Sequence, residues 1–204
     1  MDATEVAHAQ LARMRGMNAS YHQRFFSDIR FTILTVVGLF VVGAAVDRRL
    51  YLLVPVVALV GACQTAFDAS YLIFSRQYST RLEQYINRSL GHDVLVAHRM
   101  EDEYLFPLDT PKLVTVGVER FSWFGFMTLL YTAVGVGAYA AGVWASLGVI
   151  GSDIGLRAGG IYLVALAVLT IAALATGVWW FPGGEGERRL RRVLDAAFPS
   201  PPPA

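Results

Sequence analysis

The chain has 204 residues, of which 55% are hydrophobic and only 16% charged, and its mean hydropathy is +0.47. About a quarter of the residues in a soluble domain are charged, so this composition argues against an ordinary soluble domain. The formal net charge of +1 gives no reason to expect a nucleic-acid partner. The single cysteine, Cys63, excludes an intrachain disulfide.

Residues 1–30 are predicted to form a cytoplasmic amphipathic helix. Apolar side chains recur at heptad spacing, at Ala7, Leu11, Met14, Tyr21 and Phe25. No helix-stop signal precedes the apolar residues that follow, so the helix is expected to continue into the first membrane span.

Four apolar stretches are long enough to be membrane-spanning helices, since about 20 apolar residues cross the hydrocarbon core. They cover residues 31–46, 50–74, 121–150 and 156–181. The first is short, and spans the membrane if flanking arginines extend their charged ends to the interface. The sequence therefore predicts an all-α membrane protein with four transmembrane helices, arranged as hairpins over residues 31–74 and 121–181. A soluble helical bundle is the weaker alternative.

Residues 75–120 are predicted to begin with a cytoplasmic helix that ends at Gly91 and to continue as an irregular connector with a small helix or hairpin. Residues 182–204 are predicted to form a short basic helix and a proline-rich tail. The helix after the second span repeats the heptad spacing, at Tyr78, Leu82 and Tyr85. It is therefore expected to pack antiparallel on the N-terminal helix as a cytoplasmic stalk.

A hairpin turn centred on Arg48 would fix the register of this stalk. Facing residues would then include Leu11 with Tyr85, Asn18 with Tyr78, and Tyr21 with Ser75. Both heptad patterns agree with this register.

The arginines predict the orientation. Of the seventeen Lys and Arg residues, only Arg48, Arg49 and Arg157 fall in the two short turns between spans. The other fourteen lie in the termini and the central connector. By the positive-inside rule these segments are cytoplasmic, in a multi-pass protein that we expect in the plasma (inner) membrane of a bacterium.

A polar strip is predicted at the inner membrane boundary. The hairpin register places Asp28 opposite Asp68 and Thr32 opposite Gln64, and two facing carboxylates cannot both ionise cheaply. An arginine from Arg24, Arg30 or Arg76 could bridge them, which is the preferred interpretation. An ion or proton site is the alternative.

Two further groups of residues are candidates for a site. His92, His98, Glu101, Asp102 and Glu103 could ligate a metal, but their spacing matches no metal motif, and a solvated connector is the preferred interpretation. No metal and no cofactor are expected. Small residues at intervals of four in the third and fourth spans predict faces for helix association, at Ala133, Gly137, Ala141, Gly142, Ala173 and Gly177.

No catalytic motif is present, so the sequence favours a non-enzymatic membrane scaffold or interaction protein. Its expected partners are the lipid bilayer, further copies of the chain as a homo-oligomer, and a cytoplasmic protein. The alternative is an oligomeric ion channel or ion-translocating protein that uses the polar strip. In outline, long cytoplasmic helices leading into a membrane hairpin resemble small bacterial membrane-effector proteins, although no motif specific to that group is present.

Overall fold

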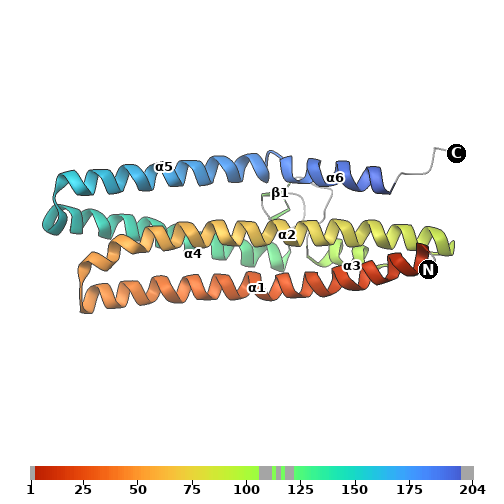
Figure 1. Cartoon of the computed structure of the whole chain (residues 1–204). Helices are drawn as coiled ribbons and strands as arrows, with labels where there is room; N and C mark the ends of the chain where they lie inside the picture. Colours follow the sequence, from red (N-terminus) through yellow and green to blue (C-terminus); the bar gives the residue numbers. More distant parts are fainter. Residues whose placement is uncertain (1–2, 106–111, 114–115, 118–121, 199–204) are drawn as a thin grey trace. The chain divides into compact units, whose positions relative to one another are not determined.

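The structure is a computed structural model that describes residues 3–105, 112–113, 116–117 and 122–198. The predicted helical fold is confirmed for the described residues, which are almost all in helices, and four of these helices are long and apolar enough to cross a membrane. The predicted proline-rich tail lies outside the described residues. The elements are α1 (Ala3–Ala45), the 3-10 turn η1 (Arg48–Leu52), α2 (Leu53–Leu90), α3 (Ala97–Tyr104), the paired two-residue strands β1 (Lys112–Leu113) and β2 (Val116–Gly117), α4 (Trp123–Val149), the π-helical turn η2 (Ile150–Ile154), α5 (Leu156–Trp180) and α6 (Glu185–Ala197) (Figure 1).

Two compact units divide these elements between them. Unit 1 consists of Met1–Arg24, Asp68–Phe126 and Trp179–Ala204, and unit 2 consists of Phe25–Phe67 and Met127–Val178. Unit 1 therefore contains the start of α1, the end of α2, and the whole of α3 and α6. Unit 2 contains most of the apolar sequence.

The turn between α1 and α2 is centred earlier in the chain than the sequence predicts. α1 runs without a break to Ala45, and the Asp47 side chain accepts a hydrogen bond from the Arg49 backbone N–H at 2.9 Å. Asp47 is therefore the N-cap of a helical turn that begins at Arg48, where the sequence analysis had centred the turn. The chain reverses about two residues earlier than predicted.

This earlier reversal shifts the register of the hairpin. In unit 1 the Ser75 hydroxyl donates to the Asn18 side chain at 3.1 Å, and Tyr21 stacks on Tyr71 with ring centroids 4.8 Å apart. The predicted partners, Tyr78 for Asn18 and Ser75 for Tyr21, are therefore wrong by three or four residues.

The same shift is present in unit 2. A Cβ atom added to Gly61 would lie 2.3 Å from Cγ2 of Thr32, so this glycine allows the two helices to approach closely. Thr32 therefore faces Gly61 rather than Gln64.

Unit 1 has its apolar core between α1 and α2. The core consists of Ala7, Leu11 and Met14 of α1 with Leu82 and Ile86 of α2, all buried. The heptad of the N-terminal helix thus marks its buried face. α2 ends at Leu90, and Gly91 follows with a φ of 69°, which confirms the predicted stop.

Two hydroxyl side chains of unit 2 form hydrogen bonds with backbone carbonyl groups of the same unit. The Ser146 hydroxyl lies 3.1 Å from the Tyr51 carbonyl oxygen and 2.7 Å from that of Gly142, and the Tyr162 hydroxyl donates to the Leu52 carbonyl at 2.7 Å. Such pairing is needed where no water is available.

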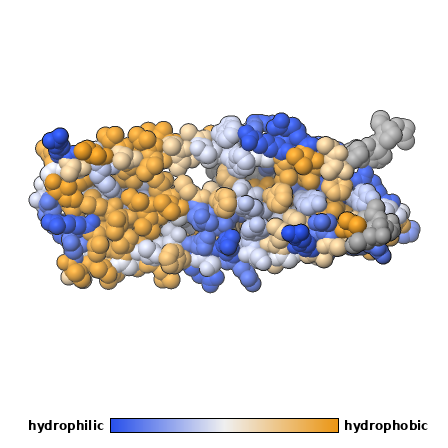
Figure 2. Space-filling model, in the orientation of Figure 1, coloured by the Kyte–Doolittle hydropathy of each residue, from blue (hydrophilic) through white to orange (hydrophobic). Residues whose placement is uncertain are grey.

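The apolar surface of unit 2 is mostly not covered by the chain itself. In the most apolar window of each span-length helix, only 17%, 22%, 22% and 6% of the residues are buried, in chain order. Over unit 2 the face in Figure 2 is largely apolar. This surface is compatible with a multi-pass membrane protein.

Candidate functional site

The candidate site is the set of polar contacts that holds α3 on α2. The residue before α3, Val96, offers no side-chain cap. Glu83 of α2 takes this role, because its Oε2 accepts hydrogen bonds from the backbone N–H of His98 at 3.1 Å and from His98 Nδ1 at 3.0 Å. A carboxylate from another helix thus accepts from the His98 N–H in the first turn of α3.

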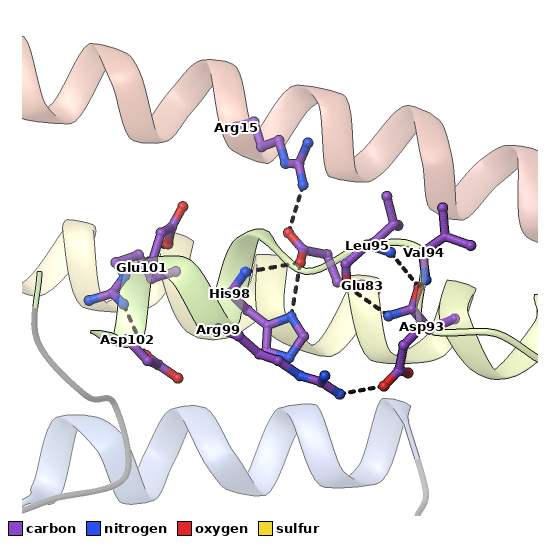
Figure 3. A network of polar contacts seen from close by, with 11 residues as sticks. Arg15, Glu83, Asp93, Val94, Leu95, His98, Arg99, Glu101 and Asp102 are labelled. Carbon is purple, nitrogen blue, oxygen red and sulfur yellow. Dashed lines mark hydrogen bonds and ion pairs between the residues drawn. The ribbon is translucent and has the colours of Figure 1, made fainter. Parts of the chain in front are cut away.

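The second oxygen of Glu83 connects the same carboxylate to α1. Its Oε1 accepts a hydrogen bond from Arg15 at 2.8 Å, and Figure 3 shows Arg15 and His98 reaching Glu83 from two different helices. Glu83 is only 2% exposed. Burial alone would raise the pKa of Glu83, but the hydrogen bonds from Arg15 and His98 outweigh it and hold the pKa below its usual value.

Arg76 of α2 makes the second charged contact with α3. Its Nε lies 3.0 Å from Glu101 Oε2 and its Nη2 lies 3.0 Å from Asp102 Oδ1. The Arg76 side chain is 1% exposed, whereas the two carboxylates are about a third exposed. Arg76 therefore connects α2 to two carboxylates of α3, and its predicted role as a bridge for Asp28 and Asp68 stays a prediction.

The segment before α3 is held by Asn87. Its side-chain oxygen accepts hydrogen bonds from the backbone N–H groups of Val94, at 3.1 Å, and Leu95, at 2.8 Å, and its amide donates to the Leu95 carbonyl. The Asn87 side chain thereby forms hydrogen bonds with backbone groups that have no helical partner, because this segment lies outside any helix.

These α2 residues lie on one side of the helix. Arg76, Glu83 and Asn87 are separated by seven and then four residues, which is the spacing of a single helical face. We call these three residues, with their contacts to α3 and the segment before it, the α3 clamp. The apolar heptad pattern does not indicate the α3 clamp, because the three residues are polar. The sequence signal that indicates it is the spacing of these polar residues, at intervals of seven and four along α2.

The clamp corrects the interpretation of the connector as solvated. His98, Glu101 and Asp102 are partly buried against α2, whereas His92 and Glu103 are exposed. Among the described residues, no group of three or more His, Cys, Asp or Glu side chains could hold a metal ion.

The opposite face of α3 is apolar and exposed. Val96, Met100 and Tyr104 follow at intervals of four and are 39%, 67% and 79% exposed. A helix of a soluble domain usually turns its apolar side to the core and its charged side to water. α3 does the reverse, because Glu101 and Asp102 contact α2 while the apolar stripe is exposed, flanked by the charged side chains of Arg99 and Glu103.

The predicted polar strip is divided between the units. Asp68 belongs to unit 1 and is 1% exposed, and Asp28 belongs to unit 2 and is partly buried. Gln64, Arg24 and Arg30 are exposed. The pairing of Asp28 with Asp68 stays a prediction, and the register from which it was derived has shifted.

The small residues of α4 form two rows. Ala133, Gly137 and Ala141 are exposed, whereas Gly142 is buried, and a Cβ atom added there would lie 2.6 Å from Cγ1 of Val54. The Gly142 position therefore serves close packing of α4 on α2, and the other row is open to a further helix. Ala173 and Gly177 of α5 are partly buried.

Comparison with protein-family models, with curated proteins and with solved structures found no match.

Proposed function

We propose that this chain is a non-enzymatic, self-associating membrane scaffold or interaction protein, and that α3 is one of its contacts with a second copy. The observation that carries the proposal is the inverted polarity of α3. Its charged side is used to fix it on α2, which leaves Val96, Met100 and Tyr104 outward, and exposed apolar stripes of this kind are typical of interaction surfaces.

The proposed setting is a bacterial inner membrane, with both termini and the connector in the cytoplasm. The arginine distribution supports this orientation. The exposed apolar surface of unit 2 supports four spans in lipid. The apolar contacts of α1 with α2 in unit 1 would then form the cytoplasmic stalk.

A second copy can complement the outer face of α3 in apolar contacts and in charge. Two α3 helices packed antiparallel around a twofold axis at Met100 would place Val96 of one copy against Tyr104 of the other. Arg99 and Glu103 lie on the same flank of the stripe, four residues apart and both exposed. Each Arg99 would therefore approach Glu103 of the other copy, twice per dimer.

The exposed row of Ala133, Gly137 and Ala141 supports association within the membrane as well, because small residues let helices of two copies approach closely. A contact in the bilayer would add to the small area that an eight-residue helix can bury. A cytoplasmic protein partner remains a further proposal.

A charge swap tests the α3 contact. In lipid nanodiscs or mild detergent, Arg99→Glu and Glu103→Arg should each weaken self-association about fivefold, since each places like charges across the twofold axis twice. The double variant should restore the parent affinity, as measured by energy transfer between labelled copies.

The matched control is Asp93→Asn, because Asp93 pairs with Arg99 within the chain. This change should leave association within twofold of the parent. If the double variant associates no more tightly than the single variants, the proposed α3 contact is wrong.

The alternative function, ion or proton translocation, rests on Asp68, a carboxylate that is 1% exposed next to an apolar stretch. Flux through liposomes that is lost in a folded Asp68→Asn variant would favour it. A defined oligomer without flux would favour the scaffold.

A further inference from the structure

Unit 1 contains a cavity of about 360 Å³ between α2 and the segment that includes the end of α5 and α6. Most of its wall is apolar and much of it is aromatic, with Tyr71, Ile73 and Phe74 from α2 and Trp180, Phe181 and Leu190 opposite them. A cavity of this size falls within the range of small-molecule sites, and its composition suits a hydrocarbon chain.

The position of the cavity in the sequence relates it to the membrane boundary. Phe74 is the last residue of the second apolar stretch, and Phe181 is the last residue of the fourth. Both stretches are predicted to end at the cytoplasmic leaflet. Trp179 and Trp180 agree with this depth, because tryptophan prefers the interface.

A cation lies at the edge of the apolar wall. The guanidinium of Arg189 lies 5.4 Å from the ring centroid of Trp179 and 5.9 Å from that of Trp180. Its Nε donates to Glu185 at 2.7 Å. Among the described residues these are the contacts of Arg189, so its two Nη groups keep donors for a further anion.

The other arginines of α6 are less suited to this role. Arg188 donates to both Glu185 and the Gly183 carbonyl, and Arg191 pairs with Glu187. Arg192 is the most exposed of the four and does not line the cavity. The other charged residue of the lining, Glu187, is paired with Arg191. The cavity thus combines an apolar wall with the cation of Arg189 at its margin, which matches an amphiphile with an anionic end.

We propose that this cavity binds one anionic phospholipid of the inner leaflet, with an acyl chain against the aromatic wall and the phosphate at Arg189. The inference rests on the proposed membrane location. The bilayer supplies such molecules at high local concentration, and a chain in the cavity would cover apolar surface that water would otherwise contact.

Tryptophan quenching by brominated lipid tests the site. In a chain with Trp123→Phe and Trp144→Phe, the remaining tryptophans are Trp179 and Trp180, both next to the cavity. In nanodiscs of phosphatidylcholine, brominated phosphatidylglycerol should reach half-maximal quenching at about a fivefold lower mole fraction than brominated phosphatidylcholine.

Arg189→Gln should remove this preference, and Arg192→Gln should keep it. The two variants are matched, because each removes one arginine near Glu185 on the same helix. Ser70→Phe, which fills the cavity from α2, should lower quenching by both lipids and serves if Arg189→Gln does not fold. Equal quenching by the two lipids in the parent, or equal loss in both arginine variants, would overturn the proposal.

Failure of the membrane location would be seen separately, as release of the chain from membranes at alkaline pH. A chain that stays in the membrane without a lipid preference would contradict the cavity site alone.

Discussion

Neutralising the two α3 carboxylates that Arg76 contacts, Glu101 and Asp102, should destabilise the packing of α3 on α2 more than replacing Arg76 does. The reason is that the two changes leave different charged groups behind, one buried and the other partly exposed to water. Glu101→Gln with Asp102→Asn neutralises both α3 carboxylates that contact a guanidinium only 1% exposed, whereas Arg76→Met leaves two carboxylates that are 32% and 33% exposed and already reach water. Breaking a buried ion pair costs about 3–5 kcal/mol, and we expect a cost near 3 kcal/mol for the double variant.

For Arg76→Met we expect about 1–2 kcal/mol, because the remaining carboxylates are partly hydrated and methionine packs well in place of the arginine stem. Hydrogen exchange of the α3 backbone amides measures the opening directly. The expected increase in exchange is about 150-fold for the double variant and about 5–30-fold for Arg76→Met.

The triple variant, with all three changes, should exchange more slowly than the double variant, because the buried charge is then gone. Asp93→Asn, in an exposed pair with Arg99, should change exchange only a few-fold. The reasoning is refuted if Arg76→Met opens α3 as much as the double variant, or if the triple variant is the least stable.

Three further predictions follow from the fold. Because the native pKa of Glu83 lies below the usual carboxyl value of 4.5, the stability that its ionised form contributes is present above that pH and is lost as the pH falls below it. Exchange of α3, corrected for intrinsic rates, should therefore rise in acid by a larger factor in the parent than in Glu83→Gln, where only the Arg76 pairs remain to be lost. In a Cys63→Ala chain in intact cells, a cysteine at Ser152 should react with an impermeant maleimide and one at Ser89 should not, and labelling at Ser89 alone would reverse the orientation. Leu82→Asp places a carboxylate at a position that is 2% exposed, so it should lower the thermal unfolding temperature or abolish expression, and an unchanged melting curve would count against the unit 1 core.

The long helices could be predicted from sequence because their signals are strong and local. Uninterrupted apolar runs define the four span-length helices, Gly91 defines the end of α2, and the heptad that starts at Ala7 defines the buried face of α1. Each of these features depends on a periodicity or on a single backbone preference.

The register of the α1–α2 hairpin and the α3 clamp depend on contacts between residues that are far apart in the sequence. The predicted register is wrong because Asp47 acts as an N-cap, whereas the sequence pattern favours a polar turn over residues 47–49. The clamp was missed because Glu83 and Asn87 were polar residues on a helix expected to pack by apolar contacts. Their partners lie up to 68 positions away in sequence, for Arg15 and Glu83, so no local pattern reveals them.

The central claim is that two copies associate through the outward apolar face of α3, and a cysteine at Met100 tests it most directly. In a Cys63→Ala chain in native membranes, mild oxidation should join two copies through a disulfide at this position, because it lies on the proposed twofold axis. A cysteine at Leu90, which is also exposed in unit 1, should remain monomeric. A chain that stays monomeric with cysteine at Met100, or that crosslinks equally well from Leu90, would contradict the account.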